Sequence, residues 1–204
     1  MHLVPTPDEV VALLRETRAL RDGHFESPNG LHSNEYLQVP LAMRYYQHAK
    51  TLSVGLSRLL RANPEIRAVI HELSIVAPAT AGLPVAYGVC EALRARQVYW
   101  AEREDGTQKL LFRQYLEQVP GEKVVLVDDI LRSGKMLYEM KGLLESNGAT
   151  VVAMAVVVYQ PTPKTPDFSP LPLYHLAKLD ATFYADAGAC ALCRRGAPVE
   201  KVRV

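Results

Sequence analysis

Apolar residues follow two alternating patterns along this chain. Short, nearly continuous apolar runs are typical of strands buried on both faces, and they occupy residues 73–77, 97–101, 123–128 and 150–159. Segments with helical spacing of apolar residues lie before and between these runs, at about residues 45–62, 83–93 and 134–146. Buried strands that alternate with helices form a parallel sheet covered on both faces. The pattern therefore predicts an α/β fold with a central, mostly parallel sheet flanked by helices.

The N-terminal segment contains a helix start. Thr6-Pro7-Asp8-Glu9 combines a capping threonine, a proline suited to the first helical position and a glutamate that can bond back to the cap. Apolar spacing extends this predicted helix to Leu20, and Asp22-Gly23 ends it. Residues 24–40 read as loop or strand, residues 160–172 read as an extended loop because they hold five prolines, and the last twenty or so residues read as irregular.

Composition narrows the class of protein. The chain has 204 residues, of which 49% are hydrophobic and 22% are charged, as in a single soluble domain with a sizeable core. A formal net charge of +1 gives no reason to expect a nucleic-acid or membrane partner. We expect a cytoplasmic protein, because the sequence has no signal peptide and no apolar run of membrane-spanning length.

The segment 124–136 carries the strongest chemical signal. A buried strand ends in Asp128 and Asp129, and a turn at 132–135, with a serine, a glycine and two cations, leads into a helix. Ligands of open α/β sheets bind beyond the carboxyl ends of strands, and a helix N-terminus attracts phosphate. Adjacent carboxylates can bond vicinal hydroxyls or hold Mg²⁺ through water. The alternative, a simple helix cap, needs one acid and not two.

This segment resembles the phosphoribosyl-diphosphate (PRPP) motif of the type I phosphoribosyltransferases. In that motif four apolar residues precede two acids, two apolar residues and a loop rich in Ser, Thr and Gly. The resemblance implies that Asp128 and Asp129 are catalytic, bond the ribose hydroxyls and hold Mg²⁺ indirectly, through water. It also implies a loop that holds the 5-phosphate and consists of Arg132, Ser133, Gly134, Lys135 and Met136.

Further blocks resemble the orotate phosphoribosyltransferases of one bacterial subgroup. These blocks are residues 23–38, 77–84, 101–106 and 190–198, and with the acidic motif they cover most of the chain. The resemblance implies a type I phosphoribosyltransferase fold in a single domain over residues 1–204, with a small hood from about 1–40 and 173–204 and a core from about 41–172. It implies a homodimer that transfers the phosphoribosyl group of PRPP to a base such as orotate and releases pyrophosphate.

The same resemblance implies roles for residues outside the acidic motif. The pyrophosphate-binding loop corresponds to Ala79, Thr80, Ala81 and Gly82. The mobile catalytic loop offers Arg103, as a catalytic residue, and Lys109 to neutralise charge on departing pyrophosphate. The base-binding residues correspond to His32, Tyr36 and Gln160.

The sequence departs from this family's pattern at ligand contacts. Arg132 and Met136 stand where the 5-phosphate loop has hydroxyls, and methionine cannot donate a hydrogen bond. Gln160 stands where the family has an arginine that contacts the orotate carboxylate. Three hypotheses stay open: an active transferase for orotate or another base, a non-catalytic nucleotide-binding or regulatory protein, and a structural dimer partner without a small ligand. The acid pair is evidence against a structural partner without a ligand, because paired carboxylates without a ligand repel each other.

Cys190 and Cys193 have the spacing of metal ligands, but a structural zinc ion takes four ligands. The sequence has no second cysteine pair, and His175 alone would not complete the set. We therefore expect packed or solvent-facing thiols at these two positions.

Overall fold

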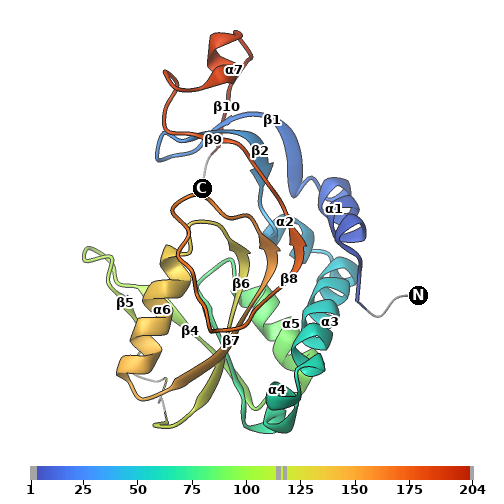
Figure 1. Ribbon diagram of the computed structural model, residues 1–204, viewed down its shortest axis with the longest axis vertical. Helices are drawn as coiled ribbons and strands as arrows, with labels where there is room; N and C mark the ends of the chain where they lie inside the picture. The colour runs from blue at the N-terminus through green and yellow to red at the C-terminus, as the bar shows by residue number, and fades with distance from the viewer. Residues whose placement is uncertain (1–3, 114–115, 117–118, 203–204) are drawn as a thin grey trace.

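The computed structural model describes residues 4–113, 116 and 119–202 of the chain. A six-stranded sheet with helices on both faces forms the body of the molecule, and a smaller four-stranded sheet lies at one end (Figure 1). The helices are α1 (Pro7–Glu16), α2 (Pro40–Met43), α3 (Tyr46–Ala62), α4 (Pro64–Ala68), α5 (Leu83–Leu93), α6 (Lys135–Ser146) and α7 (Ala191–Arg194), with a 3-10 turn at Ile70–Glu72. The strands are β1 (Leu20–Glu26), β2 (His32–Leu37), β3 (Ser74–Pro78), β4 (Gln97–Arg103), β5 (Leu110–Leu111), β6 (Lys123–Leu131), β7 (Thr150–Tyr159), β8 (Leu173–Lys178), β9 (Phe183–Tyr184) and β10 (Glu200–Lys201).

The larger sheet has the strand order β5-β4-β3-β6-β7-β8 and is parallel except for β5, which pairs antiparallel with β4. Successive side chains of a strand point to opposite faces. On β6, Val125 and Val127 therefore pack in the core under α3 and α5, whereas Val124 and Leu126 pack under α6. The predicted α/β fold with helices on both faces of a mostly parallel sheet is confirmed. Within the described ranges, no helix has the length and apolar character needed to cross a membrane.

The smaller sheet has the order β10-β1-β2-β9, and together with α7 we call it the hood. β1 and β2 form an antiparallel hairpin, and the hairpin is flanked by two short strands from the far end of the sequence. The expected hood segment at 173–204 begins with β8, which instead extends the large sheet beside β7. The tail expected to be irregular contains β9, α7 and β10, which are only two to four residues long and leave no periodic pattern.

The expected continuation of the first helix to Leu20 is wrong. The capping box of Thr6 and Glu9 is present, but α1 ends at Glu16. Arg18 then adopts a left-handed backbone conformation with φ of 58°, which reverses the chain. Leu20 is buried, as its apolar character requires, but it begins strand β1. The Asp22-Gly23 pair does not end an element and lies at an irregularity in the pairing of β1 with β2.

Candidate active site

The candidate site lies where the order of strands in the large sheet reverses. From β3 the chain moves outward to β4, and it then returns to place β6 on the other side of β3. The carboxyl ends of β3 and β6 therefore border a crevice of the kind in which α/β proteins bind ligands. Gly82, after β3, comes so close to the acid pair that a Cβ atom there would lie 2.9 Å from Oδ1 of Asp128. The structure thus brings the predicted pyrophosphate loop and the predicted ribose acids together.

Both acids of the pair are buried, and each is only 7% exposed. The N–H of Asp129 donates to Oδ1 of Asp128 at 2.8 Å, and the N–H of Ile130 donates to Oδ1 of Asp129 at 2.8 Å. Burial raises the pKa of Asp128 well above its ordinary value, and the neighbouring charge of Asp129 adds to this. Burial also raises the pKa of Asp129, against the opposing effect of Arg132. Two buried acids with raised pKa values favour binding of a cation or of hydroxyl donors.

The turn that follows β6 presents a helix N-terminus beside these acids. Gly134 precedes α6 with φ of 72° and offers no side-chain cap, and Oγ of Ser133 accepts from the N–H of Lys135 at a long 3.4 Å. A Cβ atom at Gly134 would also lie 2.8 Å from Cδ of Pro166, so the position requires glycine for two reasons. The first N–H groups of a helix have no intrahelical acceptor and attract phosphate. Ser133 and Lys135 are both exposed here.

The turn after β3 offers a second set of backbone donors. The N–H of Ala79 donates to the carbonyl of Ala101 at 2.9 Å, which fixes the start of the turn on β4. The N–H groups of Thr80, Ala81 and Gly82 have no backbone or side-chain acceptor within the described residues. Free N–H groups gathered in one turn form an anion-binding concavity.

Arg132 does not point at the helix N-terminus but joins a chain of hydrogen bonds under the hood. Its Nε–H donates to Oε1 of Gln160 at 2.9 Å, and Nε2 of Gln160 donates to Oε2 of Glu35 at 3.2 Å. Its guanidinium also lies 5.3 Å from the ring centroid of Phe183. Burial raises the pKa of Glu35 and lowers the pKa of Arg132. These hydrogen bonds connect the ends of β6 and β7 to strand β2 of the hood.

A cavity of about 760 Å³ separates the hood from the ends of β6 and β7. Its walls include Tyr36 and Phe183 from the hood, and Arg132 and Ser133 from the turn after β6. A volume of this order suits a small-molecule ligand. The cavity is therefore lined both by aromatic rings of the hood and by the turn that leads into α6.

Comparison with known proteins places this geometry in a family. The phosphoribosyl transferase domain matches residues 46–170. The orotate phosphoribosyltransferase of Carboxydothermus hydrogenoformans is 35% identical over 193 residues, which cover 95% of each chain. The chain belongs to the orotate phosphoribosyltransferase family. The Thermotoga maritima member is 34% identical over 93% of this chain and 94% of its own.

Solved structures of orotate phosphoribosyltransferases share the fold. The enzyme from Aeropyrum pernix superposes with a TM-score of 0.65 at 20% identity, over 83% of this chain and 93% of its own. The Mycobacterium tuberculosis H37Rv enzyme, solved with inorganic phosphate, gives a TM-score of 0.61 at 19% identity, over 84% of this chain and 94% of its own.

Two residues expected at the phosphates of this family's substrate have partners elsewhere. Arg103 donates to Oε2 of Glu139 on α6 at 2.6 Å and to the carbonyl of Gln108 at 2.6 Å. Met136 packs against the hydrophobic core under α6, and its sulfur lies 3.7 Å from Nη2 of Arg103. Met136 therefore does not fill the phosphate site. Lys109 is exposed on the hairpin between β4 and β5.

Of the three expected base-site residues, Tyr36 lines the cavity, and Gln160 is buried in the chain of hydrogen bonds beside it. His32 is buried within the hood, where its Nδ1 lies 2.8 Å from Nε2 of His24. Sequence reasoning missed Glu35 and His24. Both lie inside the block at 23–38 that resembles the family, but their partners come from positions more than 100 residues away.

Proposed function

We propose that the protein transfers the phosphoribosyl group of PRPP to orotate, forming orotidine monophosphate and pyrophosphate. The observation that carries the proposal is the buried pair Asp128 and Asp129 at the β3–β6 crevice, between the N-terminus of α6 and the free N–H groups of the turn after β3. The acids hold the two ribose hydroxyls. The N-terminus of α6 holds the 5-phosphate, and the turn after β3 holds pyrophosphate.

The reaction forms a bond between the base nitrogen and C1 of the ribose, while the bond from C1 to pyrophosphate breaks. The bonding electrons leave with pyrophosphate, which also takes up the proton lost by the base nitrogen, and the sugar carries positive charge in the transition state. Ionised Asp128 and Asp129 face this charge from a buried position, where electrostatic stabilisation is strong. The walls of the cavity hold base and sugar in line and exclude water.

The acid pair also fits Mg²⁺, since that ion prefers carboxylate oxygens and retains several waters. We propose that Asp128 and Asp129 hold it through water. When bound, the ion neutralises charge on the diphosphate of PRPP.

The cation for the orotate carboxylate comes, in this proposal, from Arg132. The resemblance to the family implies an arginine at position 160, where this chain has glutamine, but the guanidinium of Arg132 reaches this place from the end of the neighbouring strand β6. Glu35 accepts from the amide nitrogen of Gln160 and so turns the amide oxygen toward Arg132. The arginine at position 132 thus compensates for the glutamine at position 160, and a planar guanidinium remains available for a carboxylate.

A homodimer is the proposed assembly. Tyr45, Tyr46 and Tyr87 on the α3–α5 side of the molecule are 44%, 71% and 52% exposed, and aromatic side chains of this kind are enriched in interfaces. Sedimentation velocity at micromolar concentration tests the assembly. A monomer alone would count against it.

The activity is tested by incubating the protein with PRPP, Mg²⁺ and orotate and following loss of orotate. Parallel reactions contain uracil, adenine or hypoxanthine in place of orotate. We expect turnover with orotate alone. Turnover with another base only would refute the assignment of Arg132, and failure to bind PRPP in calorimetry would favour the non-catalytic alternative.

A further inference from the structure

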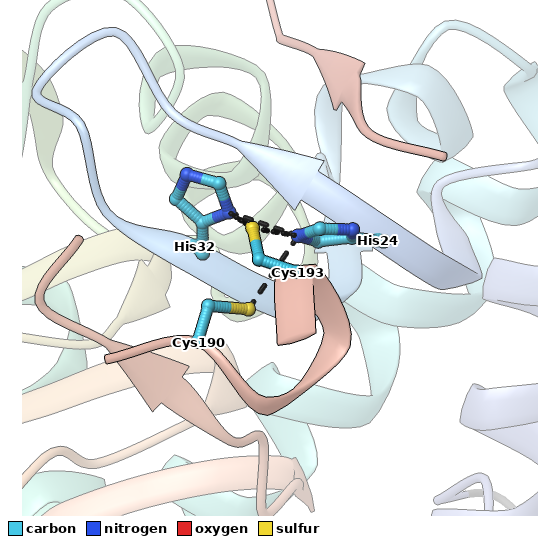
Figure 2. Close-up of side chains that lie close together, drawn as sticks. All are labelled: His24, His32, Cys190 and Cys193. Atoms are coloured by element: carbon cyan, nitrogen blue, oxygen red, sulfur yellow. Dashed lines mark hydrogen bonds between the residues drawn. The ribbon is translucent and has the colours of Figure 1, made fainter. Parts of the chain in front are cut away.

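Four side chains with metal-binding atoms converge inside the hood (Figure 2). His24 lies on β1 and His32 on β2, while Cys190 directly precedes α7 and Cys193 lies within it. Their ligand atoms all lie within 4.8 Å of one another, although His24 and Cys190 are 166 residues apart in the sequence. The two halves of the cluster thus come from distant parts of the chain.

The distances match those of a tetrahedral zinc site. Zinc binds sulfur at about 2.3 Å and histidine nitrogen at about 2.0–2.1 Å, so tetrahedral geometry places sulfur and nitrogen about 3.6 Å apart. Nε2 of His24 lies 3.5 Å from each sulfur, and Nδ1 of His32 lies 3.5 Å from the sulfur of Cys193. The two nitrogens are 2.8 Å apart, so they must separate by roughly half an ångström to share an ion.

The ring of His24 presents the cluster with a nitrogen suited to an ion. Nδ1 of His24 lies 3.0 Å from the carbonyl oxygen of Ala197, which can accept only if that nitrogen carries the proton. Nε2 of His24 then keeps a free lone pair directed at the cysteines. A backbone carbonyl behind a ligating histidine is the usual arrangement that fixes its tautomer.

The C-terminal segment of the hood adds almost no buried apolar side chain that would explain this burial. Among residues 179–202, Cys190 is the only buried side chain, and it is fully buried. His24 and His32 are 5% and 4% exposed, while β9 and β10 contribute two residues each. Small units of this kind need a metal ion or another cross-link to hold their segments together.

We propose that His24, His32, Cys190 and Cys193 bind one Zn²⁺ ion in a structural site. Four protein ligands close the coordination shell, which is typical of structural zinc and leaves no position for a substrate. Packed or solvent-facing thiols were expected at Cys190 and Cys193, and both are free thiols here, with Cys190 buried; the proposal gives them a ligating role. His175, the partner considered from the sequence, lies on β8 with its ring 5.5 Å from that of Tyr159.

The ion would stabilise one wall of the cavity. Phe25 and Ser33 directly follow the two histidines along β1 and β2, and both line the cavity. Fixing the hairpin to α7 therefore fixes the surface that faces the base. This role is independent of which base is used and of whether catalysis occurs.

The first test measures metal content in untagged protein purified with a thiol reductant. We expect one zinc per chain by mass spectrometry of the metal. After removal of zinc with a chelator, we expect Co²⁺ to restore a visible spectrum with thiolate-to-cobalt charge transfer and tetrahedral bands. Wild-type protein without stoichiometric zinc, whose metal-free form gives no such spectrum, would overturn the proposal. So would an intramolecular disulfide between Cys190 and Cys193 in freshly isolated protein.

Matched variants separate the site from general thiol effects. Cys193→Ser and His24→Gln are expected to lose the bound zinc and to melt at a lower temperature. Cys90→Ser removes the remaining free thiol, which lies on α5 away from the cluster, and is expected to keep the full zinc content. Addition of Zn²⁺ to metal-free wild-type protein is expected to restore its melting temperature, so the test does not depend on a variant that folds poorly. Equal zinc content in all variants would refute the assignment of ligands.

Discussion

Arg132 and Gln160 contact each other: the Nε–H of Arg132 donates to Oε1 of Gln160 at 2.9 Å. Both positions differ from the residues that the resemblance to the family implies at ligand contacts. Their contact shows that they are structurally coupled and not independent losses. Gln160 is 1% exposed and bonded on both sides of its amide, so it holds Arg132 in place under the hood.

Replacing Arg132 by alanine is expected to raise KM for orotate more than KM for PRPP. Hydrogen bonds to a charged group contribute about 1.5–3 kcal/mol, so kcat/KM for orotate should fall about 10- to 100-fold. Steady-state kinetics with each substrate varied in turn measure the change in KM for orotate and in KM for PRPP.

The control for this variant is Lys164→Ala. Lys164 also lines the cavity but is exposed, so it should affect KM for orotate far less. Equal effects of the two substitutions would mean that general positive charge, and not the placed guanidinium of Arg132, attracts the substrate.

Asp128→Asn is expected to abolish turnover and yet to stabilise the free protein by about 1 kcal/mol at neutral pH. Burial raises the pKa of Asp128 above its unfolded value, so the folded state binds the proton more tightly. Wild-type stability therefore decreases as pH rises from the ordinary aspartate range through the raised pKa, and the asparagine variant lacks this decrease.

Denaturant unfolding of both proteins across that pH range, without ligand, measures the difference. Asp105→Asn, in the exposed β4–β5 hairpin, should leave both stability and its pH dependence unchanged. An Asp128→Asn variant that is less stable than wild type at neutral pH would contradict the prediction.

Arg103 must leave Glu139 if it is to reach pyrophosphate. The two side chains are 29% and 32% exposed, so the ion pair is worth at most about 1 kcal/mol. Glu139→Gln should therefore lower KM for PRPP by up to about fivefold, whereas Arg103→Ala should reduce kcat.

Steady-state kinetics at low and high salt, together with melting temperatures, show whether the Arg103–Glu139 ion pair restrains Arg103 or only stabilises the fold. A structural pair predicts a lower melting temperature for Glu139→Gln and an unchanged KM for PRPP. Glu145→Gln, which breaks the exposed pair with Lys141 on the same helix, provides the comparison.

Glu122 is expected to support the fold without taking part in the reaction. It is 7% exposed and accepts hydrogen bonds from Ser74, from Gln97 at 2.7 Å and from Tyr99 at 2.7 Å, at the amino end of β6. Glu122→Ala leaves these donors without their shared acceptor and should cost about 3 kcal/mol of unfolding free energy. Activity per folded molecule should stay within about twofold of wild type, and a selective loss of kcat would contradict the structural role.

The core was predictable because its elements are coded locally. Continuous valine-rich runs gave β6 and β7, and helical spacing gave α3 and α6 with boundaries within one residue or so. The acid pair and the glycine turn were predictable because the residues of that site lie within nine consecutive positions. The first helix was predicted too long because Leu20 fits helical spacing. The chain reverses at Arg18, which has a left-handed backbone conformation that an arginine in the sequence does not indicate.

The rest depends on contacts between distant segments. Nothing near Arg132 in the sequence indicates that its side chain turns toward Gln160 and the hood, and nothing near Cys190 points to His24 and His32. Such contacts depend on how the hood closes over the sheet, which is decided by tertiary packing.

The architecture of the hood also fixes the order in which the molecule can be completed during synthesis. β1 and β2 leave the ribosome early, but Glu200, the partner of Arg21, follows 179 residues later. At about 5–20 residues per second, the hairpin exists for on the order of ten seconds before its neighbours appear. The large sheet, whose strands end at Lys178, can assemble in the meantime. The cavity beneath the hood is thus the last part of the molecule to be completed, and until then the nascent hairpin exposes two histidines and two unpaired strand edges to solvent.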